Sequence, residues 1–300
     1  MLVCVPHERG PELMGDLPGE VKCVVSERPD LDAPGVTFWV PPFLRPAPTA
    51  ETLTALRDLQ VVQLLTAGAD AWIGRLPGPV TLCDGRGIHT KATSEWALTA
   101  ILSYLRDFPL FARAQARQEW AYKVTDELAD KRVLIVGSGA IGEGIAARLA
   151  PFEVTIDRVA RTARDGVHGL AELPDLLPKA DVVVVIVPLT SQTRGMVDAA
   201  FLAALRDGAL FVNAARGPVV DTEALTAELA TGRIGAALDV TDPEPLPPRH
   251  PLWAMPNVLL TPHVGGSVRG TLRRAYALAG EQIRRYAAGE ALINIVTGEY

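Results

Sequence analysis

The chain has 300 residues, of which 48% are hydrophobic and 21% are charged, a composition typical of globular proteins. At about 100–200 residues per domain, this length predicts two domains. The formal net charge of -6 and the absence of a basic tract argue against nucleic acid or an anionic membrane surface as the main partner, and favour small molecules.

The cysteines and the first residues indicate the compartment. Cys4, Cys23 and Cys83 lie in apolar, strand-like contexts without metal-ligand spacing, so we expect buried thiols in a reducing compartment and no metal site. The opening MLVCVPHERG lacks the basic and long apolar segments of a signal peptide, and no run of about 18 apolar residues occurs. We therefore expect a cytoplasmic protein with no membrane partner.

Short apolar runs typical of strands alternate with helical patterns along the chain. The runs are residues 2–6, 21–26, 36–40, 61–65, 80–83, 132–137, 153–156, 181–187, 209–213, 235–240 and 257–260. This alternation predicts an α/β protein with parallel sheets. The unbroken VVVVIV segment fits a strand that is covered on both faces.

Two long helical patterns suggest how the domains are connected. Residues 94–118 have apolar positions at helical spacing, with Pro109 expected to kink or break the helix, and the segment can bridge two domains. A second pattern, from about residue 268 to residue 288, can return the chain to the first domain. We therefore predict that residues 1–94 and 272–300 form one domain and residues 95–271 the other.

The segment RVLIVGSGAIGEGIAARLA (132–150) has the order strand, tight turn, helix. Gly137, Gly139 and Gly142 stand in the G-x-G-x-x-G spacing of dinucleotide-binding turns. The first glycine allows the turn, the second lets a pyrophosphate approach the backbone, and the third lets the helix pack on the strand. With its flanking strand and helix, the motif predicts dinucleotide binding and not an ordinary glycine turn.

The next strand should end in a group that meets the adenosine ribose. Asp157 lies 20 positions after Gly137, where an acidic residue would hold the 2′-hydroxyl of NAD. The following Arg158, Arg161 and Arg164 instead suit the 2′-phosphate of NADP, or form an ordinary solvated loop. Spacing alone leaves these alternatives open.

Three charged or titratable residues follow later strands. Arg216 follows a buried strand, Glu244 stands between two prolines, and His263 follows the apolar LLTP segment. In open parallel sheets, the carboxyl ends of the strands carry the ligand. A single histidine at a strand end is ordinarily structural, so it is the set that indicates a site.

The chain resembles the D-isomer-specific 2-hydroxyacid dehydrogenases, the family of glyoxylate/hydroxypyruvate reductases and phosphoglycerate dehydrogenase. The resemblance rests on five segments in family order, GSGAIG (137–142), VPLTSQTRGMVD (187–198), VNAARGPVVD (212–221), ALDVTDPEPLP (237–247) and TPHVGG (261–266). It implies two Rossmann-like domains with parallel sheets and an active site in the interdomain cleft. It also implies that Arg216, Glu244 and His263 are catalytic.

The implied reaction interconverts a small 2-keto acid and its D-2-hydroxy acid, and these residue types suit it. Reduction needs a hydride on the carbonyl carbon and a proton on its oxygen, which His263 can supply near neutral pH. Glu244 would favour the imidazolium and hold the ring. Arg216 offers a planar fork of donors to the substrate carboxylate and polarises the carbonyl.

The resemblance implies further contacts. The backbone N–H groups of Ala67 and Gly68 would meet the substrate carboxylate; the less favoured alternative is that TAG is simply a turn. Asp239 would lie near the nicotinamide carboxamide, or cap the end of its strand. The cofactor-binding residues expected are Gly137, Gly139, Ala140, Ile141, Gly142, Arg158, Val187, Pro188, Thr193, Ala214, Asp239 and Gly265.

The family pattern favours Arg158 over Asp157 at the ribose, because residues 151–158 are about two residues shorter than the usual connection and strand alternation lets only one neighbour face the cofactor. We therefore expect NADP to be preferred, with NAD possible. We also expect a homodimer formed through the nucleotide-binding domain. Residues 94–118 carry more apolar positions than one core-facing stripe needs, at Trp96, Leu98, Ile101, Leu102, Leu105 and Phe108.

Other functions are compatible with the same fold. A corepressor-like, nucleotide-sensing module would retain these motifs without turnover. Formate or phosphite oxidation is a further alternative, disfavoured for formate because Glu244 stands where formate dehydrogenases carry glutamine. The segment GRGIHTKATSEWAL (85–98) lacks the Asn-rich approach common in the family, so the sequence leaves the particular 2-hydroxy acid open.

Overall fold

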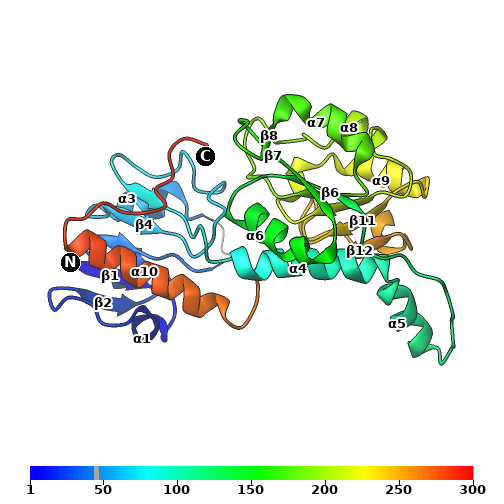
Figure 1. The fold of residues 1–300 in the computed structure, drawn as a ribbon. Coiled ribbons are helices and arrows are strands. Elements are labelled where there is room, and N and C mark those ends of the chain that lie inside the picture. Colours follow the sequence, from blue (N-terminus) through cyan, green and yellow to red (C-terminus); the bar gives the residue numbers. More distant parts are fainter. Residues whose placement is uncertain (44–46, 300) are drawn as a thin grey trace. The chain divides into compact units, whose positions relative to one another are not determined.

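The computed structural model describes residues 1–43 and 47–299. The chain divides into two compact units (Figure 1). Unit 1 contains Met1–His89 and Arg269–Tyr300, and unit 2 contains Thr90–Val268. The chain therefore leaves unit 1 and returns to it, and both divisions lie a few residues before the ones expected from the sequence.

Unit 1 is built on a parallel sheet of five strands in the order β2-β1-β3-β4-β5. The strands are β1 (Leu2–Val5), β2 (Lys22–Val25), β3 (Phe38–Trp39), β4 (Val61–Gln63) and β5 (Thr81–Cys83). The helices are α1 (Gly10–Met14), α2 (Pro29–Asp32), α3 (Ala50–Ala55) and α10 (Thr271–Ala287). Because α10 comes from the end of the chain, the second crossing completes this unit.

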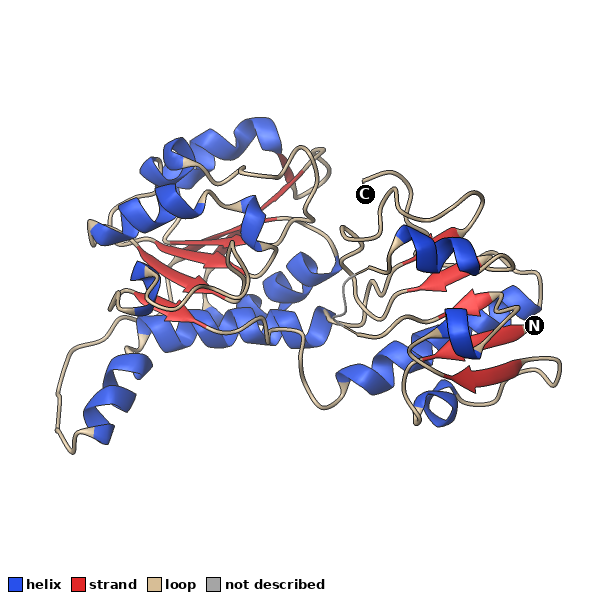
Figure 2. Cartoon of the chain, turned by 180° about the vertical axis from the view of Figure 1, so that it is seen from behind, coloured by secondary structure: helices blue, strands red, loops and turns tan. Residues whose placement is uncertain are grey.

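Successive side chains along the strands of unit 1 point to opposite faces of the sheet and pack into two separate cores. Val3 and Val5 pack with Tyr276 of α10 on one face, whereas Cys4 packs with Leu53 of α3 on the other. Helices accordingly cover both faces of the sheet (Figure 2). Strands covered on both sides need apolar residues at successive positions, which explains runs such as LVCV.

Unit 2 is built on a parallel sheet of seven strands in the order β12-β11-β10-β9-β6-β7-β8. The strands are β6 (Arg132–Val136), β7 (Thr155–Ala160), β8 (His168–Gly169), β9 (Val182–Val185), β10 (Leu210–Asn213), β11 (Gly235–Leu238) and β12 (Val258–Leu260). The α-helices are α4 (Thr90–Leu105), α5 (Phe108–Ala116), α6 (Ala140–Leu149), α7 (Leu173–Leu176), α8 (Ala199–Ala203) and α9 (Thr222–Ala230). Short 3-10 turns complete it, η1 (Ala150–Phe152), η2 (Leu170–Glu172), η3 (Leu177–Lys179), η4 (Gly217–Val219) and η5 (Pro251–Trp253).

The two faces of the unit 2 sheet are set by alternation in β6. Leu134 and Val136 pack with the helices α7, α8 and α9, whereas Val133 and Ile135 pack with α4 and α6. Figure 1 shows these helices on opposite faces of the sheet. Every residue of β9 is buried, as its unbroken valines predict.

The helical segment over 94–118 breaks after Leu105, in agreement with the kink or break expected at Pro109: Asp107 takes a left-handed φ of 52° and Pro109 lies in the first turn of α5. Two strands differ from expectation. β7 runs to Ala160, past the expected end at residue 156. β8 was not predicted, since two residues, His168 and Gly169, give no apolar pattern.

The strand order indicates the edge of the unit 2 sheet at which a ligand would bind. β7 and β8 lie on one side of β6, and β9 to β12 lie on the other, so the direction of winding reverses between β6 and β9. Ligands of such sheets bind beyond the carboxyl ends of the strands at this switch point. The glycine turn follows β6 there, and the loop after β9 begins beside it.

Candidate active site

The glycine turn has the shape that a dinucleotide needs. Gly137 has a φ of 117°, and a Cβ on it would lie 2.5 Å from the carbonyl oxygen of Ile186. A Cβ on Gly142 would lie 1.9 Å from the carbonyl oxygen of Gly137. Gly139, in contrast, has no neighbouring atom within 4 Å of its Cβ position. The first and third glycines are therefore required by packing, while the space beside the second fits an approaching pyrophosphate.

Strand register decides which of the two ribose candidates faces the glycine turn. Asp157 is aligned with Leu134 and Arg158 with Ile135, so the two side chains leave β7 on opposite faces. Arg158 lies on the α6 side, where its Nη1 donates to Oε2 of Glu143 at 2.5 Å. Asp157 lies on the other side, 3.2 Å from Nε of Arg132.

A second arginine reaches the same turn. Nη2 of Arg164 donates to the carbonyl oxygen of Ser138 at 2.6 Å and lies 3.8 Å from Oε1 of Glu143. The loop that carries it is closed by paired backbone hydrogen bonds between Arg164 and Val167. Sequence reasoning missed Glu143, although its place directly after the third glycine is a usable signal.

The loop after β9 is held by its own hydrogen bonds. Oγ1 of Thr193 donates to the carbonyl oxygen of Pro188 at 2.6 Å and accepts from the backbone N–H of Thr190 at 2.8 Å. Val187, next to Pro188, packs partly against the core. Ala214, after β10, donates its N–H to the carbonyl oxygen of Val185 at 3.2 Å. The expected cofactor residues Ala140 and Ile141 open α6 beside this edge.

Asp239 holds the turn that carries His263. Its buried carboxylate accepts hydrogen bonds from Thr261 at 2.6 Å, the N–H of Val264 at 2.8 Å and the N–H of Gly265 at 2.7 Å. This is the strand-end cap that the sequence offered as one alternative. Trp96 supports the turn from α4, because its Nε1 donates to Oγ1 of Thr261 at 3.0 Å.

His263 and Glu244 form a close pair. Nδ1 of His263 lies 2.6 Å from Oε1 of Glu244, and both side chains are about one-third exposed or more. Nε2, the other ring nitrogen, has no hydrogen-bond partner among the residues that the structure describes. His263 has a φ of 54°, a conformation that non-glycine residues adopt at some energetic cost and that recurs at functional sites.

Arg216 follows β10 in an extended conformation at the start of η4. Its Nη1 donates to the carbonyl oxygen of Ala215 at 2.7 Å, and Asn213 holds the loop by accepting from the N–H of Ala215 at 3.0 Å. The next residue, Gly217, packs so closely on the loop after β11 that a Cβ would lie 1.9 Å from the carbonyl oxygen of Thr241. Tight packing thus joins the Arg216 loop to the loop that leads to Glu244.

The expected substrate residues Ala67 and Gly68 belong to unit 1. Their turn is closed by Oγ1 of Thr66, which donates to the carbonyl oxygen of Gly68 at 3.0 Å. The backbone N–H of Gly85, from a neighbouring loop, donates to the carbonyl oxygen of Thr66 at 2.6 Å. The backbone geometry is that of a stabilised turn, and a contact with substrate stays a prediction.

Two further histidines have structural roles. Nδ1 of His250 accepts from the N–H of Leu252 at 3.3 Å, so this side chain caps a short helical turn. His89 is buried beside Phe43, with ring centroids 5.9 Å apart.

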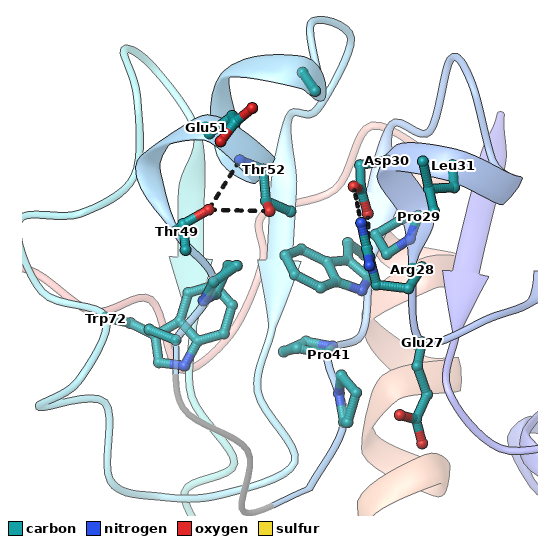
Figure 3. Close-up of a pocket in the computed structure, with 15 residues that line it drawn as sticks. Glu27, Arg28, Pro29, Asp30, Leu31, Pro41, Thr49, Glu51, Thr52 and Trp72 are labelled. Atoms are coloured by element: carbon teal, nitrogen blue, oxygen red, sulfur yellow. Dashed lines mark hydrogen bonds and ion pairs between the residues drawn. The ribbon is translucent and has the colours of Figure 1, made fainter.

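Unit 1 also contains a cavity of about 720 Å³ (Figure 3). Trp39 and Trp72 form part of its wall, edge to face with centroids 5.6 Å apart, and so do Arg28 and Asp30, which pair at 2.8 Å. None of the residues expected at the active site lines this cavity. Within the described part of the chain, no helix has the length and apolar character needed to cross a membrane.

Comparison with known proteins identifies the family. The family model described as D-isomer specific 2-hydroxyacid dehydrogenase, NAD binding domain, matches residues 98–265 of the chain. The chain is 34% identical over 267 residues to a glyoxylate reductase of Thermofilum pendens, covering 82% of this chain and 78% of that protein. It is 33% identical over 267 residues to a formate dehydrogenase of Arabidopsis thaliana, covering 83% and 68%.

Solved structures agree over the whole chain. A D-isomer specific 2-hydroxyacid dehydrogenase from Xanthobacter autotrophicus, in complex with NADPH and MES, has a TM-score of 0.85 at 35% identity, covering 99% of this chain and 97% of that chain. An NADPH-dependent glyoxylate/hydroxypyruvate reductase from Sinorhizobium meliloti has a TM-score of 0.85 at 29% identity, covering 100% and 99%.

The glycine turn, the His263–Glu244 pair and these matches define a nicotinamide-dependent oxidoreductase with two parallel α/β domains. The chain belongs to the D-isomer-specific 2-hydroxyacid dehydrogenase family.

The glycine turn gives a test that separates folding from cofactor binding. Gly139→Ala should leave the melting temperature unchanged, because its Cβ position is empty, but weaken binding of NADP⁺ and NAD⁺ by about tenfold or more. Gly142→Ala should lower stability by about 1–3 kcal/mol, because its Cβ overlaps the carbonyl of Gly137. Thermal unfolding and calorimetric titration measure the two effects. Wild-type cofactor affinity in Gly139→Ala would contradict the assignment.

Proposed function

We propose that the chain reduces small 2-keto acids such as glyoxylate or hydroxypyruvate, with NADPH preferred over NADH and His263 as the proton donor. The observation that carries this proposal is the 2.6 Å contact between His263 and Glu244, in the same unit as the glycine turn. Relatives named glyoxylate reductase and glyoxylate reductase/hydroxypyruvate reductase support the substrate class.

The reaction moves a hydride and a proton onto one carbonyl group. When bound, the nicotinamide supplies the hydride to the carbonyl carbon. His263 gives a proton from Nε2 to the carbonyl oxygen, and the ketone becomes a hydroxyl. Glu244 accepts the hydrogen bond from Nδ1–H, which orients the ring for the transfer. In the reverse direction, neutral His263 takes the proton from the hydroxyl.

Arg216 binds and polarises the substrate in this proposal. Its guanidinium can present paired N–H groups to the carboxylate, with the adjacent carbonyl oxygen within the same electrostatic field. The close contact of Gly217 with Thr241 holds the Arg216 loop against the loop that leads to Glu244. The backbone N–H groups of Ala67 and Gly68 are proposed to bind the same carboxylate.

Replacing His263 tests the catalytic assignment. We expect His263→Ala to lower kcat for glyoxylate or hydroxypyruvate by about 10²–10⁴-fold while the cofactor still binds, because general acid catalysis contributes that much. Arg216→Lys should keep the charge but lose the fork, and so lower kcat/KM. His250→Ala is the matched control, since this histidine only caps a turn.

The same assays distinguish the alternatives. A panel of 2-keto acids and formate is assayed by absorbance with both cofactors. Near-wild-type kcat in His263→Ala would contradict the assignment of His263 as the proton donor. Oxidation of formate alone would favour the activity named for the Arabidopsis relative. No turnover on any substrate, with cofactor binding intact, would favour the nucleotide-sensing module.

The face of the sheet that Arg158 occupies supports the proposed preference for NADP(H). Its guanidinium lies on the α6 side with that of Arg164, whereas Asp157 points to the opposite side. Guanidinium groups suit a 2′-phosphate, and a carboxylate on that face would repel it.

We therefore expect kcat/KM to be higher with NADPH than with NADH. We also expect Arg158→Ala to reduce the ratio by about tenfold, because one charge-assisted hydrogen bond contributes about 1.5–3 kcal/mol. Steady-state kinetics with both reduced cofactors measure the ratio. A wild-type enzyme that favours NADH, or an unchanged ratio in Arg158→Ala, would contradict this choice.

A homodimer is proposed from the apolar surface that follows α4. Ile101 and Leu105 are buried in the unit 2 core, so part of the expected apolar excess is used internally. The exposed side chains lie further along, at Phe108 (61%), Trp120 (98%), Tyr122 (84%) and Val124 (79%). Figure 1 shows α5 and the segment after it projecting from the body of unit 2. Exposed aromatic residues of this kind mark protein interfaces.

We expect sedimentation equilibrium at micromolar concentration to give a dimer. Replacing Trp120 and Tyr122 by Ser should raise the dissociation constant at least about tenfold, because buried aromatic anchors contribute about 2 kcal/mol or more each. Replacing Trp253 on η5, which is also exposed (56%), by Ser is the control. A wild-type protein that sediments only as a monomer would rule out the proposal.

A further inference from the structure

Glu143 places a carboxylate between the two arginines that face the glycine turn. Oε2 accepts from Nη1 of Arg158 at 2.5 Å, and Oε1 accepts from Oγ of Ser138 at 2.6 Å. Nη2 of Arg164 lies 3.8 Å from Oε1. The side chain is 44% exposed, so water and a ligand can both reach it.

The charge on this carboxylate is secure. The hydrogen bond from Ser138 and the positive charges of Arg158 and Arg164 lower the pKa of Glu143. The acidic residue expected at the ribose, Asp157, points to the other face of the sheet toward Arg132. Glu143 is therefore the negative charge that lies against the arginines at this edge.

We propose that Glu143 determines how strongly this site distinguishes NADP(H) from NAD(H), by competing with the 2′-phosphate for Arg158. This inference rests on the proposed function, in which Arg158 meets the adenosine ribose. It assigns to a residue of the first turn of α6 a role that spacing in the chain gives to Asp157 of β7.

The two cofactors meet this carboxylate differently. A 2′-phosphate carries about 1.5–2 negative charges and needs the same donors that Glu143 occupies, so it must displace the carboxylate or bind beside a like charge. The 2′-hydroxyl of NAD is neutral, and it can donate a hydrogen bond to a carboxylate without displacing it from Arg158. Glu143 therefore weakens the binding of NADP(H) more than that of NAD(H), and so reduces the preference of the site for NADP(H).

Calorimetric titration of the apo-protein with NADP⁺ and NAD⁺ tests this competition. We expect Glu143→Gln to lower the Kd for NADP⁺ by about tenfold, because it removes a like charge while keeping the side-chain shape, and to leave the Kd for NAD⁺ equal or higher. Glu143→Ala should change the ratio of the two constants in the same direction. Asp175→Asn, which removes an exposed charge from α7, is the matched control and should change neither constant.

A double mutant shows whether the effect passes through Arg158. In an Arg158→Ala background, Glu143→Gln should lose most of its effect on the Kd for NADP⁺. An equal effect in both backgrounds would mean that Glu143 acts on the ligand through its general electrostatic field and not through Arg158, and would overturn the inference. So would an unchanged ratio in Glu143→Gln and Glu143→Ala, or weaker NADP⁺ binding, which would make Glu143 a positioning residue for Arg158.

The same titrations separate this inference from the proposed function. A wild-type protein that binds NAD⁺ more tightly than NADP⁺ would overturn the proposed preference. Glu143→Gln would still support the inference in that protein if it shifted the ratio toward NADP⁺. A wild-type preference for NADP⁺ with no shift in Glu143→Gln would leave the proposed function standing and remove the inference.

Discussion

Residues aligned across parallel strands point to the same face of a sheet, and this constraint places the chemistry of unit 2. Because Arg158 is aligned with Ile135, it shares the face on which α6 packs, and it meets the first turn of that helix. Asp157 is aligned with Leu134 and takes the opposite face. A shift of one residue in the pairing of β7 would exchange the two side chains and replace positive charge by negative charge beside the glycine turn.

Close backbone contacts fix the loops at the carboxyl edge of the unit 2 sheet. The third glycine of the turn packs on the first, and Gly217 packs on the loop after β11, at distances that exclude any side chain. The carboxylate of Asp239 fixes the next turn with three hydrogen bonds and so holds His263 at a positive φ. The polar groups of the edge are therefore positioned by backbone packing and by one buried carboxylate, which suits a site that must hold its geometry during a proton transfer.

Two carboxylates at this edge lie against cationic or titratable side chains. Glu244 contacts His263, and Glu143 contacts both Arg158 and Arg164. Each pair joins a group that can meet a ligand to a partner of opposite sign that orients it. The two carboxylates have different consequences, because Glu244 holds the proposed proton donor whereas Glu143 occupies hydrogen-bond donors that an anionic ligand would need.

The sequence by itself determined the fold class, the glycine turn and the family, because these depend on local patterns of apolar residues and glycines along the chain. It also placed Arg216, Glu244 and His263 after strands of one parallel sheet. It did not determine the length of β7, the strand β8, or the partner of Arg158.

Only the tertiary structure decided these, since the register between β6 and β7 and the packing of α6 bring Glu143 and Arg158 together from positions 15 residues apart. Side-chain direction in a strand depends on pairing with a neighbour, and no count of positions along the chain contains that information.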